Sequence, residues 1–226
     1  NSSKSFRRLV FDELCANFFT LSENRNRIKK NKLAKKFSEE RSILIKKNLP
    51  FNLTKSQERV LKEINVDLCS KKRMFRIIQG DVGSGKTIVS LLAISNVIES
   101  GYQCSLMGPT EILAKQHFEL AKKIYKDTNF KIDFLTGKTE IKDRKKILRD
   151  LESGKTNLII GTHALFQKKI HFKKLGLAII DEQHKFGVKQ RSELAKKGGN
   201  NCDVLLMSAT PIPRTMMMSL YGDMDI

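Results

Sequence analysis

Long apolar runs are missing from this sequence of 226 residues. A membrane-spanning helix needs roughly 18 or more consecutive apolar residues, so we expect no membrane span. The N-terminus, NSSKSFRRLV, has neither an initiator methionine nor the apolar core of a secretory signal peptide. We therefore expect no secretory leader, and the missing methionine indicates a piece cut from a longer chain.

Cysteine is scarce as well. The four cysteines lie far apart, and none belongs to a C-x-x-C pair. This spacing argues against a zinc site or a disulfide framework and is typical of reduced thiols in a cytosolic protein. We therefore predict a cytoplasmic location. The four histidines are also scattered, which argues against a metal cluster.

Acidic residues are outnumbered. The sequence has 24 Asp and Glu against 43 Lys and Arg, which gives a formal net charge of +19 and a pI near 9.9. Such an excess favours a polyanionic partner, and nucleic acid is the obvious one. The alternative is a lysine-rich composition spread over solvated faces, because the lysines are dispersed through every segment.

Residues 1–50 differ in pattern from the rest of the chain and predict a helical connector. A first amphipathic helix is indicated by apolar residues at helical spacing, namely Phe6, Leu9, Val10, Leu14, Phe18 and Leu21. The basic stretch RNRIKKNKLAKKF is expected to continue as a helix with charges around most of its circumference. It is either a solvated connector or a contact with a DNA backbone. Pro50 breaks this helix and marks the expected domain boundary.

Residues 51–226 predict an α/β domain. Six apolar runs are predicted to be strands buried on both faces, namely MFRII, QCSLM, KIDFL, NLIIG, GLAIID and DVLLMSA. The segments between them, such as Thr87–Ser100 and Glu111–Lys126, have the periodicity of helices, and Gly101 stands where a C-terminal glycine is expected. This repeated alternation predicts a mainly parallel sheet between helices.

The sequence GDVGSGKT, residues 80–87, matches the pattern G-x-x-x-x-G-K-[ST]. Its glycines let successive backbone N–H groups turn inward around phosphate oxygens, and the following helix points its positive end there. Lys86 can then reach the β- and γ-phosphates, and the Thr87 hydroxyl can ligate Mg²⁺. The expected strand before the loop and helix after it support this interpretation. We predict a nucleotide site made of Gly80, Asp81, Val82, Gly83, Ser84, Gly85, Lys86 and Thr87.

A second carboxylate is needed to hold the metal, and LAIIDEQH supplies it. Four apolar residues carry Asp181 to the end of a predicted strand, at the carboxyl edge of the sheet, where ligands of open α/β sheets bind. Asp181 is therefore the expected Mg²⁺ partner, directly or through a water. Glu182 follows it and can polarise the attacking water; the alternative is an ordinary surface carboxylate.

These motifs resemble those of a known family. The P-loop, DEQH at Asp181–His184 and SAT at Ser208–Thr210 are similar in order and spacing to motifs I, II and III of superfamily 2 helicases. The strings QGDVGSGKT, GPTEILAKQH, GTHALFQ, DEQHKFGVKQR and SATPIPRT resemble the RecG family of bacterial branched-DNA translocases. The related transcription–repair coupling factor, which also has a TPIPRT-like string, is the alternative. DEQH favours RecG because the coupling factor usually has another residue pair after the motif II acidic residues.

The resemblance implies a RecA-like fold, ATP and Mg²⁺ as cofactors, and an ATP-dependent helicase. Its expected role is remodelling branched DNA, such as stalled forks and Holliday junctions, in recombination and repair. It also implies adenine recognition by Gln57, with Phe51 packing on the base. The pattern Thr54-x-x-Gln57 is in addition a capping box that starts a helix, and both roles are compatible.

Further residue roles follow from the same resemblance. Three loops resemble those that contact DNA phosphates through backbone N–H groups and hydroxyls, which position a strand without reading its sequence; ordinary polar turns are the alternative. The candidates are Pro109, Thr110, Gly137, Thr162 and His163. The segment Ser208, Ala209 and Thr210 is expected to couple the sites.

His184 resembles the residue that joins motif II to motif III, where it would sense the γ-phosphate. It completes a predicted catalytic set of Lys86, Asp181, Glu182 and His184. His117, by contrast, is expected to pack on its own helix.

The sequence ends at Ile226, shortly after the third motif. The second motor domain and the wedge domain of RecG-like proteins are therefore expected to lie in the parent chain. An arginine finger supplied by the second domain is worth about 10³–10⁵ in rate. We thus expect a monomer that binds nucleotide but hydrolyses it poorly. A P-loop kinase of small molecules and a non-enzymatic DNA-binding module are the competing interpretations, and they leave DEQH and SAT, or the intact Lys86 and Asp181, unexplained.

Overall fold

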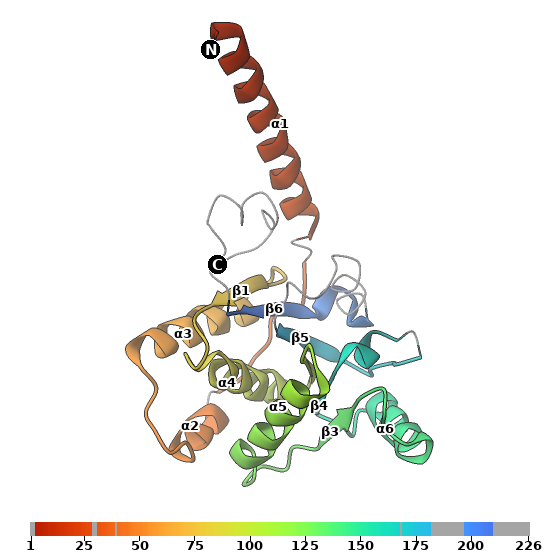
Figure 1. Cartoon of the computed structure of the whole chain (residues 1–226). Coiled ribbons are helices and arrows are strands. Elements are labelled where there is room, and N and C mark those ends of the chain that lie inside the picture. The colour runs from red at the N-terminus through yellow and green to blue at the C-terminus, as the bar shows by residue number, and fades with distance from the viewer. Residues whose placement is uncertain (1–2, 29–30, 39, 168, 182–196, 210–226) are drawn as a thin grey trace.

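A six-stranded, all-parallel sheet forms the centre of the computed structural model, which describes residues 3–28, 31–38, 40–167, 169–181 and 197–209 (Figure 1). The sheet order is β1-β6-β5-β2-β4-β3. The strands are β1 (Phe75–Gln79), β2 (Gln103–Met107), β3 (Ile132–Leu135), β4 (Leu158–Gly161), β5 (Leu175–Asp181) and β6 (Asp203–Ser208). The helices are α1 (Lys4–Ile28), α2 (Glu40–Lys47), α3 (Lys55–Cys69), α4 (Lys86–Glu99), α5 (Glu111–Ile124) and α6 (Ile141–Ser153), with the short 3-10 turns η1 (His163–Phe166) and η3 (Gly199–Asn201).

Both faces of the sheet are buried, which explains why its strands are continuous apolar runs. One face packs against α2, α3, α4 and α5, and the other packs against α6. Along β6, Leu205 and Met207 enter the first of these two clusters, whereas Val204 and Leu206 enter the second. This alternation follows from the two-residue period of a strand. The predicted α/β fold with a parallel sheet between helices is therefore confirmed.

Each of the six runs predicted as strands coincides with an observed strand to within about two residues, a normal scatter for element ends. Gly101 follows α4 with a φ of 78°, and its N–H donates to the carbonyl of Ile98 at 2.9 Å. A left-handed residue of this kind commonly ends a helix, and glycine adopts it without steric cost. The predicted C-terminal role of Gly101 is confirmed.

The predicted first helix is confirmed as α1, which extends away from the sheet (Figure 1). Its apolar side chains Phe6, Leu9 and Phe11 are exposed. No helix among the described residues is both long and apolar enough to cross a membrane.

The basic stretch RNRIKKNKLAKKF follows its prediction only in part, because residues 25–28 form the end of α1. Residues 31–38 are not helical, and Asn31 forms an antiparallel bridge with Lys72. Lys32 and Lys35 are buried, and each Nζ lies 2.6 Å from Oδ2 of the buried Asp203. These two lysines are therefore neither solvated nor available to a DNA backbone. The helical prediction is therefore wrong for residues 31–38, where the carboxylate at the start of β6 pairs with both ammonium groups inside the protein.

The chain before Pro50 also contributes to the core. Ile45 of α2 is buried in the same apolar cluster as residues of α3 and α4. Because Phe37, Ile45 and Leu49 pack in the same apolar cluster as the strands and helices of the sheet, we propose that the ATP-binding domain begins near Asn31, with α1 as the helical extension. The division predicted at residue 50, from the change of sequence pattern and the proline, stays a prediction.

Candidate nucleotide and nucleic-acid site

Three strand ends bring the predicted nucleotide residues to one edge of the sheet. β6 lies between β1 and β5, with Gln79 opposite Ser208 and Asp181 opposite Met207. The N–H of Gly80 donates to the carbonyl of Ser208 at 3.2 Å. The P-loop, the end of β6 and the Asp181 carboxylate therefore occupy neighbouring positions at the carboxyl edge, where open α/β sheets bind ligands.

The P-loop has the backbone that its glycines allow. Gly83 and Gly85 adopt φ angles of 82° and 83°, a left-handed region that disfavours any residue with a Cβ. A Cβ at Gly85 would also lie only 2.4 Å from Nε2 of Gln57. The conformation of the loop thus requires glycine at this position, and a larger residue would also displace the Gln57 side chain.

The first turn of α4 is suited to an anion. Its N-cap residue, Gly85, makes no side-chain cap hydrogen bond, and the turn contains no acidic residue. By contrast, α3 and α5 have threonine caps and a glutamate in their first turns. The positive end of the α4 dipole and its leading N–H groups are therefore not balanced by side chains of that turn.

Lys86 lies at the centre of this loop. Its Nζ donates to the carbonyls of Gly80 at 2.5 Å and Asp81 at 2.7 Å, with Oγ of Ser84 at 3.4 Å. Phosphate oxygens are stronger acceptors for an ammonium group than neutral carbonyls. The lysine is thus held inside the loop, in a position to exchange these carbonyls for phosphate.

Gln57 joins α3 to the P-loop. Its Oε1 accepts from the N–H of Thr54 at 2.9 Å, and Oγ1 of Thr54 accepts from the N–H of Gln57 at 3.3 Å, so the predicted capping box is present. Nε2 of Gln57 also donates to the carbonyl of Ser84 at 2.9 Å. Phe51 lies half exposed before this helix. Adenine recognition by Gln57 and Phe51 stays a prediction.

Asp181 has a partner that could not be assigned from the sequence. Nε2 of His117 lies 2.8 Å from Oδ2 of Asp181, and both side chains are largely buried. From the sequence, His117 is expected only to pack on its helix. The signal was present in the pattern Ala114, His117, Ala121 and Ile124, which are the buried residues of α5 and place the imidazole on the apolar face.

The predicted DNA-contacting loops follow three neighbouring strands, β2, β4 and β3. The N–H of Gly108 donates to the carbonyl of Gly161 at 2.9 Å, and Nζ of Lys138 lies 3.0 Å from Oε2 of Glu111. The loops after these strands are therefore linked into one surface beside the P-loop edge.

The predicted DNA-contacting residues on that surface differ in how exposed they are to solvent. Thr110 is exposed and caps α5, because its Oγ1 accepts from the N–H of Leu113 at 3.2 Å. Gly137 and His163 are exposed as well, and Pro109 is half buried. Thr162 is only 3% exposed, which favours His163 over Thr162 as the contacting side chain in its loop.

Three predicted site residues, Glu182, His184 and Thr210, lie outside the described residues. Of the coupling segment, Ser208 is buried at the end of β6 and Ala209 is half buried beside it. Their proposed coupling role therefore stays a prediction.

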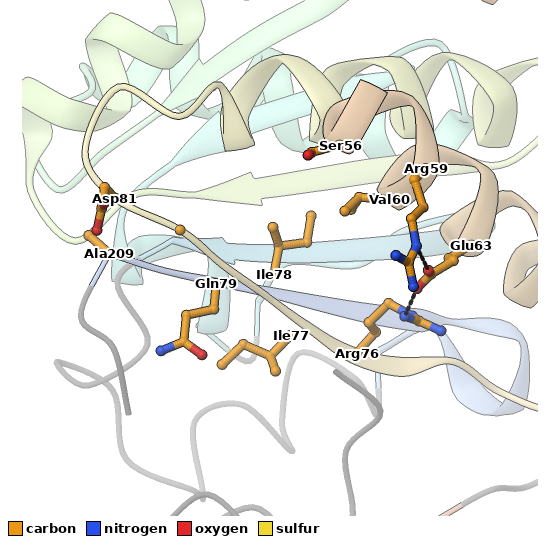
Figure 2. A pocket seen from close by; sticks show the side chains of 11 residues that line it. Ser56, Arg59, Val60, Glu63, Arg76, Ile77, Ile78, Gln79, Asp81 and Ala209 are labelled. Atoms are coloured by element: carbon orange, nitrogen blue, oxygen red, sulfur yellow. Dashed lines mark hydrogen bonds and ion pairs between the residues drawn. The ribbon is translucent and has the colours of Figure 1, made fainter. Parts of the chain in front are cut away.

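A cavity of about 710 Å³ opens along β1, next to the P-loop. Figure 2 shows that Arg59, Glu63 and Arg76 lie at one end, joined by ion pairs, and that Asp81 and Ala209 lie at the other. Lys86 and Asp181 are not among the residues that line it. The cavity therefore adjoins the predicted phosphate site without containing its main groups.

Comparison with known proteins decides the family. The model of the DEAD/DEAH box helicase family matches residues 54–218, about three quarters of the chain. The chain belongs to the DEAD/DEAH box helicase family. The match includes the P-loop, Asp181 and the sequence that follows β6.

The predicted resemblance of the chain to RecG is also confirmed. It is 45% identical over 227 residues to the ATP-dependent DNA helicase RecG of Streptococcus pneumoniae, an alignment that covers 99% of the chain and 33% of the relative. A solved structure, RecG bound to a three-way DNA junction, matches with a TM-score of 0.86 and 41% identity over 97% of this chain and 29% of that one.

More distant helicases share the fold. A hypothetical ATP-dependent RNA helicase from Sulfolobus tokodaii matches with a TM-score of 0.61 at 18% identity, over 82% of this chain and 56% of that one. The chain spans about a third of the length of the first curated relatives it matches.

Proposed function

We propose that this chain is the ATP-binding motor domain of a RecG-like DNA helicase, which couples ATP hydrolysis to the remodelling of branched DNA in recombination and repair. The observation that carries the proposal is the convergence of the P-loop, the Asp181 carboxylate and the end of β6 on one sheet edge. The similarity to RecG over nearly the whole chain supports it and favours RecG over the transcription–repair coupling factor.

The residues present fit ATP. The first turn of α4 offers N–H donors without a side-chain cap, and Lys86 is held inside the loop. We propose that the triphosphate replaces the carbonyls that now accept from Lys86, and that Gln57 and Phe51 bind the adenine. Val82 at the tip of the loop is exposed and not part of the core, so its side chain is free to cover a bound nucleotide.

The residues also fit Mg²⁺, which prefers oxygen ligands. Thr87 provides a hydroxyl in the first turn of α4, and Asp181 provides a carboxylate at the end of β5. When bound, the ion neutralises charge that develops on the phosphates. We propose that Glu182 then orients the attacking water, and that His184 relays the state of the γ-phosphate to Ser208, Ala209 and Thr210.

DNA is the proposed partner of the neighbouring surface. The loops that contain Pro109, Thr110, Gly137 and His163 are linked beside the nucleotide edge, and the chain has a formal charge of +19. Contacts to phosphates would position the DNA backbone, with the branch point recognised elsewhere in the parent protein. We propose that a second motor domain and a wedge domain of that protein complete a monomeric cytoplasmic enzyme.

The test compares this chain with its Lys86→Ala variant. A fluorescent ATP analogue is titrated with Mg²⁺ present, and a labelled three-way DNA junction is titrated at several salt concentrations. We expect nucleotide binding that is lost in Lys86→Ala. We also expect junction binding that weakens as salt rises, because each neutralised phosphate changes the slope of log K against log salt by about −0.9.

Two results would overturn the proposal. One is nucleotide binding that does not depend on Lys86. The other is failure to bind the junction together with transfer of phosphate from ATP to a small hydroxyl compound, which would indicate a P-loop kinase.

A further inference from the structure

A histidine occupies a position of α5 that packing alone would assign to an apolar residue. The buried residues of this helix are Ala114, His117, Ala121 and Ile124, with the i, i+3 and i+4 spacing of a core-facing stripe. Two of the other three are alanines and one is isoleucine. A buried imidazole costs free energy unless its N–H groups find acceptors, so its place in this stripe calls for a specific partner.

That partner is Asp181, at a sequence separation of 64 residues. An ionised carboxylate can only accept hydrogen bonds, so Nε2 of His117 carries the proton and donates to Oδ2 across 2.8 Å. The side chains are 9% and 14% exposed, and little water can therefore compete for the contact. The geometry fixes the orientation of the carboxylate at the carboxyl edge of β5.

We propose that His117 is a positioning residue for Asp181, which holds the carboxylate in the orientation that binds the metal of a bound nucleotide. This inference rests on the proposed nucleotide-binding function. Outer groups that orient a metal ligand through a hydrogen bond typically change metal affinity by about 10- to 100-fold when they are removed. Asp181 would meet this description, with the imidazole as its outer partner.

The helix that bears His117 gives the contact a second consequence. α5 starts directly after Thr110, one of the predicted DNA-contacting residues, and His117 follows seven positions later in the sequence. Seven residues make almost two turns, which places the two residues on nearly the same face and about 10 Å apart along the axis. Gly108 is packed against this helix, since a Cβ there would lie 2.9 Å from the N of Ala114. The Asp181 carboxylate is thereby connected, through His117 and α5, to the loop that would contact DNA.

The experiment measures how much Mg²⁺ strengthens binding of a fluorescent ATP analogue, as the ratio of its Kd in EDTA to its Kd with Mg²⁺. The variants are His117→Leu, which keeps apolar volume without a donor, and His117→Gln, whose amide nitrogen can take the place of Nε2. His171→Leu changes an exposed histidine outside the site and serves as the matched control. If His117→Leu fails to fold, His117→Asn replaces it, because its shorter side chain cannot reach Oδ2 equally well.

In EDTA, we expect His117→Leu and the unaltered chain to bind the analogue with the same Kd. With Mg²⁺, we expect the Kd of His117→Leu to be at least about 10-fold higher than that of the unaltered chain. His117→Gln should recover most of the Mg²⁺ effect. Equal affinities of His117→Leu and the unaltered chain with Mg²⁺ would overturn the proposal. So would a loss of the same size in EDTA and in Mg²⁺, which is what a purely structural role predicts. Failure of the proposed function looks different, because the unaltered chain and Lys86→Ala would then behave alike.

Discussion

Replacing Asp203 with asparagine tests how the segment after α1 is held to the domain. Oδ2 of Asp203 lies 2.6 Å from Nζ of both Lys32 and Lys35, and its Oδ1 accepts from the N–H of Met74 at 2.6 Å. All three ionic side chains are fully buried. The asparagine side chain would keep the volume and an acceptor for Met74, but it would leave two buried ammonium groups without a counter-charge.

The expected cost of Asp203→Asn is about 3–5 kcal/mol of unfolding free energy, the usual result of removing one partner of a buried ion pair. The loss of unfolding free energy is limited because Lys32 also donates to two backbone carbonyls at the end of α3. These are the carbonyls of Asp67 and Leu68, at 3.0 and 3.1 Å. A whole domain is stable by only about 5–15 kcal/mol. The variant should therefore be markedly less stable while still folding under mild conditions.

The pH dependence provides a second, independent readout. Burial lowers the pKa of Lys32 below its ordinary value, and Asp203 opposes that shift. Removing Asp203 therefore lowers this pKa further. Between the folded pKa and the unfolded value of about 10.5, the unfolded chain binds more protons, so stability rises with pH. The deficit of Asp203→Asn should shrink as the pH is raised from 7 toward 10.

Urea unfolding followed by circular dichroism measures both effects. Glu111→Gln is the matched control, because the Glu111–Lys138 pair is exposed and should contribute no more than about 1 kcal/mol. The buried contacts of Lys32 and Lys35 with Asp203 do not hold the segment if Asp203→Asn loses no more unfolding free energy than this control. The same conclusion follows if the loss of unfolding free energy grows as the pH is raised.

Two further predictions concern packing and thiol reactivity. Gly161→Ala should destabilise the domain by about 1–3 kcal/mol, the usual cost of overpacking, because the alanine Cβ would lie 2.0 Å from the carbonyl oxygen of Leu135. Gly137→Ala is the control, since Gly137 has open space around it. Equal urea midpoints for the two variants would show that position 161 is not tightly packed. Burial raises the pKa of the Cys104 thiol, and it raises that of Cys202 to about 12. A thiol reagent at pH 8 should therefore label the exposed pair fast and the buried pair only on unfolding; fast labelling of all four native cysteines would contradict the burial of Cys104 and Cys202.

The features that were predictable from the sequence depend on neighbouring residues. Each strand is a continuous apolar run because both faces of the sheet are covered, and the capping box joins Thr54 to Gln57 across three positions. The P-loop can be predicted from the sequence for the same reason, since its phosphate-binding groups are consecutive backbone N–H groups. Asp181 could be assigned to the sheet edge because it directly follows an apolar run.

Contacts between distant residues could not be predicted in this way. Lys32 pairs with Asp203 at a separation of 171 residues, and a basic stretch looks the same in sequence whether its lysines are solvated or buried. His117 was recognisable as a residue of an apolar stripe, but only the sheet order brings Asp181 within 2.8 Å of it. Thr162 likewise follows a strand in the sequence, as a residue of an exposed turn would, but it is buried where β3 pairs with β4.

The sequence by itself thus determined the strand and helix pattern, the parallel α/β class and the phosphate loop, because each of these depends on local periodicity or on a contiguous backbone. The tertiary structure alone decided which charges are paired in the interior and which side chain orients Asp181. Those contacts depend on where the fold brings remote segments together, and the stabilisation of a buried charge is set by its partner rather than by its neighbours in the chain.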